Sequence, residues 1–472
     1  MTFNNCLLSL KRRTSFALAC WGGLLLPSLV IAAPPVPLSQ YDLGERPDPV
    51  VRVFWQDRET ASLKWADVTK GEEWSLAPAE IEGFPELDPE RQNLVQMDIL
   101  DGKLLVGIRD DDGGGYESGW VAVSTGVVGH SHGDHYDWQF EHPPEVLTQK
   151  LDTNQGNPAH LYTYDGAFYL ANDTNDGFTQ FFPNDLASRS KKAGRFFSGG
   201  GNHITLAAVK NRVAYSTWID GGGPNAGRVD VVNLRKSGNR KSGYSFTLPS
   251  GTIHGATANS GRVFFAPAEG VCWVETDSKA QQSPEGVEIH HLDLGADPET
   301  QKPLRTGAFS THRNYVLFST GAGESSALCL VDSKADDPEV MKLPIEVADG
   351  LSLTTPQPIL TAAGKRLAIL FQDRKVGDGE ELLTIVDLDP NGDRDFSDAE
   401  VARTIVVGPT EIDGHYGHHS IAFDSDGAYA CLSNSGDGTL WLISLISFEV
   451  LAEFNVEGCP GSVLAIGARN RH

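Results

Sequence analysis

The segment His160-Leu-Tyr-Thr-Tyr-Asp-Gly-Ala-Phe-Tyr-Leu-Ala171 consists of an apolar strand, an Asp-Gly turn and a second apolar strand. Similar segments begin at His203, at His254 and at His419. Short runs of β-branched and aromatic residues between turn residues are typical of antiparallel strands. No long amphipathic helical pattern interrupts these runs, so the chain is predicted to be all-β.

The strand pairs recur along the chain at a regular interval. His203 follows His160 by 43 residues, and His254 follows His203 by 51 residues. Repeats of about 40 to 50 residues with several short strands each are the mark of β-propeller blades, which stack because a single blade cannot bury both of its faces. Further repeats begin near Gln96, Ser310 and Pro358.

The two ends of the chain predict how the propeller closes. The run 462–467 resembles a first strand without partners, whereas 50–55 and 61–66 resemble later strands without a first one. Together they complete one blade. We therefore expect a single β-propeller domain over residues 33–472, with eight blades, or seven as the alternative.

The first 32 residues have the features of an export signal. Lys11, Arg12 and Arg13 precede an apolar run over residues 16–31, and Val30-Ile31-Ala32 forms a cleavage site. We therefore expect a periplasmic protein that begins near Ala33. No other apolar run approaches the ~20 residues needed to span a bilayer, so no membrane insertion is expected after signal removal.

The charge of the chain excludes one class of partner. The formal net charge is −25, and loss of the three positive charges of the predicted signal would make it −28. Such a surface repels nucleic acid and attracts cations. We therefore expect no nucleic-acid partner.

Four cysteines lie outside the predicted signal, and none has the Cys-x-x-Cys spacing of a zinc site. In an oxidising compartment they could form two disulfides in three possible pairings. We favour Cys431 with Cys459, and Cys272 with Cys329, because the residues flanking the second pair are similar.

The densest group of metal-ligand residues lies in Gly129-His-Ser-His-Gly-Asp-His-Tyr-Asp-Trp138. Imidazole nitrogens and a carboxylate suit a borderline ion such as zinc, and the small residues between them let a short segment fold around one ion. The alternative is a solvated polar loop. The predicted ligands in this segment are His130, His132, Asp134 and His135.

A second predicted zinc site lies at the propeller axis. His160, His203 and His254 begin three consecutive blades, and the first strand of each blade is innermost, so the three imidazoles should converge on one face. We expect the His130–His135 segment to link into the His160 blade and to share this face. The alternative is that each histidine only fixes the contact between blades. His415 and His419, in a third group with His418, could add a donor or line the mouth.

A calcium-like pattern occurs near residue 390. Oxygen donors at positions one, three, five, seven and twelve match the spacing of a calcium-binding loop. Arg394 replaces the glycine that such loops need at position six, so an acidic hairpin is the alternative. The predicted calcium donors are Asp389, Asn391, Asp393, Asp395 and Glu400.

Most of the chain resembles the AztD-type periplasmic zinc metallochaperones. The resemblance rests on the motifs 132–137, 158–160, 201–203, 253–262, 413–415 and 456–467. It implies zinc binding and transfer of zinc to the solute-binding protein of a zinc ABC transporter. The chain departs from the family at Asn202-His203, where the family has paired histidines, and at Ala256, where the family has a glutamate.

The main hypothesis is a zinc store and donor rather than an enzyme. The inner histidines would hold the ion, and the His130–His135 segment would act as a transfer arm. One alternative is a hydrolase or lactonase-type propeller that uses a metal to activate water, although no nucleophile motif such as Gly-x-Ser-x-Gly is present. Another is a binding propeller without a metal.

Overall fold

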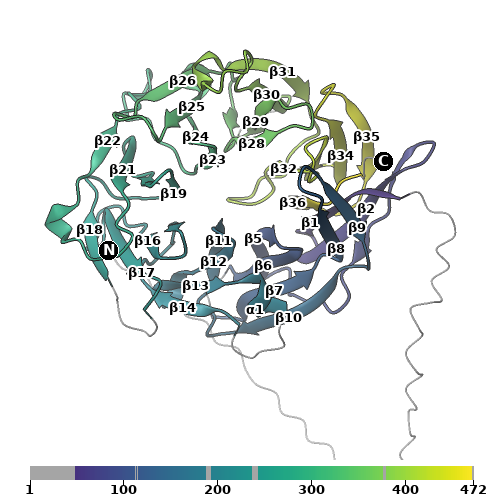
Figure 1. The fold of residues 1–472 in the computed structure, drawn as a ribbon, viewed down its shortest axis with the longest axis horizontal. Coiled ribbons are helices and arrows are strands. Elements are labelled where there is room, and N and C mark those ends of the chain that lie inside the picture. Colours follow the sequence, from purple (N-terminus) through teal and green to yellow (C-terminus); the bar gives the residue numbers. More distant parts are fainter. Residues whose placement is uncertain are drawn as a thin grey trace, which may run out of the picture. The chain divides into compact units, whose positions relative to one another are not determined.

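The computed structural model describes residues 48–111, 113, 115–187, 193–236, 243–375 and 379–469. In these residues eight antiparallel sheets of four or five strands are arranged in a ring, which is an eight-bladed β-propeller (Figure 1). The predicted all-β propeller is confirmed, with eight blades rather than seven. The predicted signal, residues 1–32, lies outside the described residues.

In blades two to eight, the strands follow chain order from the inner edge to the outer edge. Blade two contains β5 (Gln92–Leu100), β6 (Lys103–Asp110), β7 (Ser118–Ser124) and β10 (Glu145–Asp152); blade three contains β11 (Pro158–Tyr164), β12 (Ala167–Asn172), β13 (Gly177–Phe181) and β14 (Arg195–Ser198). Blade four contains β15 (Leu206–Val209), β16 (Val213–Thr217), β17 (Arg228–Asn233) and β18 (Gly243–Thr247); blade five contains β19 (Ala256–Asn259), β20 (Arg262–Phe265), β21 (Val271–Glu275) and β22 (His290–Leu292).

The second half of the ring follows the same plan. Blade six contains β23 (Ser310–His312), β24 (Tyr315–Thr320), β25 (Ala327–Asp332) and β26 (Val340–Pro344); in blade seven, β27 (Leu351–Leu353) and β28 (Gln357–Leu360) both pair with β29 (Arg366–Arg374), followed by β30 (Leu382–Asp387) and β31 (Glu400–Val406). Blade eight contains β32 (Ser420–Phe423), β33 (Tyr429–Asn434), β34 (Thr439–Ser444) and β35 (Val450–Asn455).

Blade one joins the two ends of the described chain. Its inner strand is β36 (Pro460–Ile466), which pairs with β1 (Pro49–Asp57) so that Ala465 lies opposite Val53. The other strands are β2 (Ser62–Lys70), β3 (Trp74–Leu76) and β4 (Ala79–Glu80). This confirms the predicted closure of the ring by a C-terminal strand.

The cores lie between adjacent blades because neighbouring side chains on a strand face opposite sides of the sheet. In β20, Phe265 packs toward blade four with Tyr215, whereas Phe264 packs toward blade six with Phe318. A blade is therefore buried on both faces. This burial explains why its strands are nearly continuous apolar runs.

The connections define the two faces of the propeller. We call the face on which the chain enters each inner strand the entry face; the turns between second and third strands also lie on it. The inner strands then run to the opposite face, where tight turns such as Asp101-Gly102 lead into the second strands. Both positions of this turn have left-handed backbone, with φ of 53° at Asp101 and 69° at Gly102, which such a short hairpin requires.

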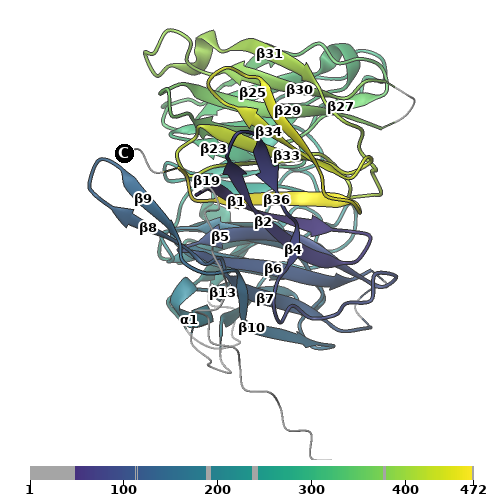
Figure 2. The ribbon, with the colours of Figure 1, turned by 90° about the vertical axis from the view of Figure 1, so that its right-hand side faces the viewer.

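The hairpin formed by β8 (Val127–Ser131) and β9 (Tyr136–Phe140) is an insertion in blade two. It lies between β7 and β10, and its base is next to the β5–β6 turn, where the Thr125 amide donates to the Gly102 carbonyl at 2.9 Å. It therefore leaves the propeller on the opposite face and extends away from the blades (Figure 2). The prediction that it links into the His160 blade on the entry face is wrong, because the segment joins the third and fourth strands of one blade.

The four cysteines outside the predicted signal are unpaired. Cys272 in β21 and Cys329 in β25 occupy equivalent third strands and face successive inter-blade cores, so a whole sheet separates them. Cys431 faces the core between blades eight and one, whereas Cys459 lies in the link that precedes β36. Both predicted disulfides are therefore wrong.

Within the described residues, no helix is long and apolar enough to cross a membrane.

Candidate metal centre

Three histidines from consecutive blades meet at the inner edge of the entry face. His160 is the third residue of β11, and His203 and His254 lie in the links that precede β15 and β19. We call these three residues the inner histidine cluster. The imidazole centroids are 4.3 Å apart for His160 and His203, 5.2 Å for His203 and His254, and 6.2 Å for His160 and His254. The sequence prediction that the three converge is thus borne out by the geometry.

The Nδ1 atom of each clustered imidazole faces an oxygen acceptor. His160 Nδ1 lies 2.9 Å from the Ile204 carbonyl, and His254 Nδ1 lies 3.2 Å from the Gly307 carbonyl. A carbonyl only accepts, so these Nδ1 atoms carry the proton and the neutral rings present an Nε2 lone pair. His203 Nδ1 faces Asp173 at 3.3 Å, and its Nε2 is buried without a hydrogen-bond partner. Such fixed tautomers are the usual setting of metal-binding histidines.

Asp173 supports the cluster from behind. This carboxylate, in the 3₁₀ turn η2 (Asp173–Asn175), is buried and forms an ion pair with Arg109 at 3.1 Å. It also accepts the Ile204 amide at 3.1 Å, and thereby fixes the link that carries His203. The sequence analysis did not identify Asp173, because its partners are 30 and more residues away in the chain.

Burial disfavours protonation of two of the clustered imidazoles, His160 and His254. It lowers the pKa of His160 to about 3, with repulsion from a protonated His203 as the next cause. Burial is also the main cause that lowers the pKa of His254. Protons therefore compete with a metal for the imidazoles of His160 and His254 only at a pH lower than is usual for histidine.

His415 adds a fourth imidazole from the other side of the ring. It lies in the loop between β31 and β32, and this loop extends toward the middle of the ring in Figure 1. Its ring stacks 5.8 Å from His254 and 6.1 Å from His203, and burial lowers its pKa. Arg58 holds the loop through the Glu411 carbonyl at 3.2 Å. Four imidazoles match the tetrahedral preference of zinc.

A tighter group of donors lies behind this loop and includes His419. Among the described residues, only Asp373, Glu381 and His419 form a group of three whose ligand atoms all lie within 4.8 Å of one another. The inner histidine cluster is more open, so a bound metal would draw its imidazoles together.

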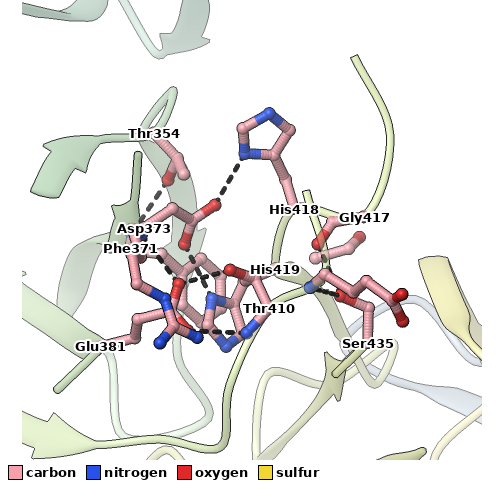
Figure 3. Close-up of polar contacts among 12 residues, drawn as sticks. Thr354, Phe371, Asp373, Glu381, Thr410, Gly417, His418, His419 and Ser435 are labelled. Atoms are coloured by element: carbon pink, nitrogen blue, oxygen red, sulfur yellow. Dashed lines mark hydrogen bonds and ion pairs between the residues drawn. The ribbon is translucent and has the colours of Figure 1, made fainter. Parts of the chain in front are cut away.

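The hydrogen bonds of the Asp373 group are already complete (Figure 3). His419 is buried, with Nδ1 at 2.7 Å from Asp373 and Nε2 at 3.0 Å from the Gly408 carbonyl. Glu381 accepts the Thr410 amide at 2.6 Å and the Arg374 amide at 2.8 Å. His419 is therefore a buried residue that links blades seven and eight, and both of its nitrogens are already hydrogen-bonded. It has no free nitrogen to offer as the metal ligand that the sequence predicted.

The predicted hairpin ligands gather around a residue that the sequence analysis did not select. Asp137 lies 3.0 Å from His132 Nε2 and 3.8 Å from His135 Nε2, and the two imidazoles stack at 5.2 Å. Asp134 is exposed, and the hydrogen bond from His135 at 2.8 Å lowers its pKa. His130 contacts Gln139 at 3.2 Å. The pairing of His130 with Asp137 across the hairpin was the sequence signal that could have identified this carboxylate.

The calcium-like loop follows β30. Asp389 forms an ion pair with Arg366 at 3.0 Å, and its other oxygen accepts the Arg394 amide at 3.0 Å. Asn391 and Asp393 accept amides of the same loop, each at 2.8 Å. Arg394 adopts the left-handed conformation, with φ of 75°, that position six requires. The loop thus has calcium-like backbone geometry, but its first carboxylate is neutralised by Arg366.

The two departures from the resembled family leave no extra donor at the cluster. Asn202 is exposed, with a left-handed φ of 67°. Ala256 is buried as the first residue of β19. The candidate donors of this cluster are therefore His160, His203 and His254, with His415.

Comparison with known proteins supports the fold. No protein-family model matches the chain, and no curated protein matches it. Two structures of AztD from Citrobacter koseri, one of them the apo form, are each 17% identical with a TM-score of 0.60, over 90% of this chain and all of theirs. The dihydro-heme d1 dehydrogenase NirN is 13% identical with a TM-score of 0.51, over 91% of this chain and 78% of its own. At these identities the similarity establishes the propeller fold, which occurs in an enzyme as well.

Proposed function

We propose that this protein is a zinc store that binds one ion at the inner histidine cluster and passes it to another protein. The observation that carries the proposal is the shared orientation of the three imidazoles. Each directs Nδ1 at an oxygen acceptor and leaves Nε2 for a ligand, and the buried Nε2 of His203 has no partner. Neutral imidazoles held in this way suit zinc.

His415 makes the site suited to carrying an ion rather than to catalysis. With four imidazoles the ion would be coordinatively saturated, whereas catalytic zinc keeps an open position for water. Asp173, the carboxylate beside the cluster, is already engaged by Arg109 and the Ile204 amide, which makes it a poor general base. We therefore favour a carrier over a metal-dependent hydrolase or a metal-free binding propeller.

We further propose that the receiver is the solute-binding protein of a zinc ABC transporter and that both act in the periplasm. The motifs shared with the AztD-type metallochaperones support this partner, and the fold shared with AztD of Citrobacter koseri agrees with it. The predicted export signal supports the compartment. The strongly acidic chain would favour entry of a cation.

The hairpin offers a second, weaker zinc site formed by His132, His135 and Asp137, with His130 and Asp134 nearby. Its exposure and its position on the opposite face separate it from the inner histidine cluster. Calcium binding by the Asp389–Glu400 loop stays a prediction, and the ion pair with Arg366 counts against it.

The test is a zinc titration of the mature protein against a chromophoric chelator at pH 7.5. We expect one tight site, which His203→Ala weakens by at least about tenfold through loss of a ligand, while the thermal midpoint of the apo protein changes little. His291→Ala is the matched control, since this exposed imidazole lies on the outer strand β22 and contacts the Glu269 carbonyl. Absence of zinc binding by the unmodified protein would overturn the proposal. Unfolding of His203→Ala with and without zinc would instead assign the cluster a packing role.

A further inference from the structure

His418 is an imidazole of the entry face that the proposed zinc site does not use. It lies three residues after His415 in the β31–β32 loop, and its side chain is 39% exposed. Its Nδ1 atom lies 2.9 Å from Asp373 Oδ2. A carboxylate accepts hydrogen bonds, so the Nδ1 atom of His418 is the donor in this contact. His418 therefore keeps its Nδ1 proton and presents a free Nε2 lone pair.

Asp373 is built to hold this imidazole in one orientation. It lies near the end of β29 with its side chain 1% exposed, and its second oxygen accepts from His419 Nδ1 at 2.7 Å. Figure 3 shows the His418 ring directed away from the carboxylate and from His419. A buried carboxylate behind an accessible imidazole is the arrangement that orients histidine ligands toward metals.

The loop combines a fixed base with a tip at the zinc site. At the base, His419 donates to the Gly408 carbonyl at 3.0 Å, and the Ser435 hydroxyl donates to the Gly417 carbonyl at 2.5 Å. At the tip, His415 stacks on His203 and His254. His418 is thus the next imidazole after His415 on the same loop.

We propose that His418 is an exchange ligand, which takes zinc transiently as the ion enters or leaves the inner histidine cluster, and that Asp373 is its positioning residue. In this step a bond from zinc to His418 Nε2 forms before the bond to His415 breaks. The Nδ1 proton of His418 stays on the ring, so no proton is released. The ion passes from four ligands through five and back to four, so it need not be freed to water. This inference rests on the proposed function.

The test measures zinc exchange separately from zinc affinity. The mature protein, loaded with one equivalent of zinc, is mixed in a stopped-flow instrument with excess 4-(2-pyridylazo)resorcinol. We expect His418→Ala to release zinc about tenfold more slowly, comparable with the smallest change in affinity or activity caused by loss of an outer-shell partner, with affinity within about twofold of the unmodified protein. His291→Ala should match the unmodified protein in both measurements.

A double-mutant cycle tests the part played by Asp373. Asp373→Asn should also slow release, and adding it to His418→Ala should slow release no further. A thermal melt of each variant detects damage to the fold, because Asp373 also binds His419. Additional slowing in the double variant would overturn the positioning role.

The possible outcomes are distinct. Release from His418→Ala at the unmodified rate would overturn the exchange role, and a large loss of affinity would make His418 a resting ligand instead. Failure of the unmodified protein to load zinc would overturn the proposed function itself, and it would be detected before any release is measured.

Discussion

Each imidazole of the inner histidine cluster has one nitrogen committed before any metal arrives. The Ile204 carbonyl, Asp173 and the Gly307 carbonyl hold the three rings through Nδ1, so the Nε2 atom of each ring is available to a metal in a fixed orientation. Less conformational entropy is then lost on binding.

The residue scale is also where sequence reasoning reached its limit. The three histidines were predictable because each begins a repeat, and repeats in a propeller place equivalent residues around one axis. Asp173 and Asp373 were not predictable as partners of histidines. Their contacts with His203 and His418 join segments distant in the chain, and acidic residues are common in it.

The lowered pKa values predict how the apo protein responds to acid. His160 titrates at about 3 in the fold and near 6.5 when unfolded, so the unfolded chain binds more protons between these values. The contribution of His160 to stability is fully present above pH 6.5 and is lost as pH falls below it, at up to about 1.4 kcal/mol per pH unit. Urea unfolding of the apo protein from pH 7.5 to 5 should show this loss, and His160→Gln should reduce it. An identical pH slope in both proteins would contradict the prediction.

At the scale of elements, the hairpin and the β31–β32 loop carry exposed histidines to different faces. The histidines of each segment are adjacent in the sequence, but the sequence does not say on which face of the propeller a segment lies. A segment between two strands can be either a link between blades or an insertion within one blade. The pairing of Glu145 with Ser124 makes β10 the fourth strand of blade two, so the hairpin that precedes β10 is an insertion within that blade.

The separation of these two elements predicts that their metal sites are independent. A variant with alanine at His130, His132 and His135 should keep the affinity of the inner histidine cluster within about twofold, since additivity holds for distant sites. It should lose any weaker second equivalent of zinc. Titration by isothermal calorimetry measures both events, and Ser131→Ala in the same hairpin is the control. A strong loss of the tight site would show that the hairpin reaches the cluster after all.

At the scale of the whole molecule, the propeller depends on β36 because it supplies the inner strand of blade one. Eight blades and their closure were predictable, since the repeat length, the unpaired final strand and the orphaned first strands all agreed. The disulfide prediction failed. The similar sequences around Cys272 and Cys329 mark equivalent positions in successive blades, and a whole sheet separates the two positions.

This closure predicts the effect of a truncation after Cys459. It removes β36, including the buried Val463 and Ile466, each worth about 1.5–3 kcal/mol of burial, and exposes the edge of β1 that pairs with it. Together the two side chains contribute about 3–6 kcal/mol, comparable with the lower end of the roughly 5–15 kcal/mol by which domains are stable, so the truncated chain should melt far lower or fail to fold. Zinc should not restore it, because the inner histidine cluster belongs to blades three to five. A truncation after Arg469, which keeps β36, is the control for a thermal melt followed by circular dichroism. An unchanged melting temperature without β36 would contradict closure by this strand, since the ring would then be stable while one blade lacked its inner edge.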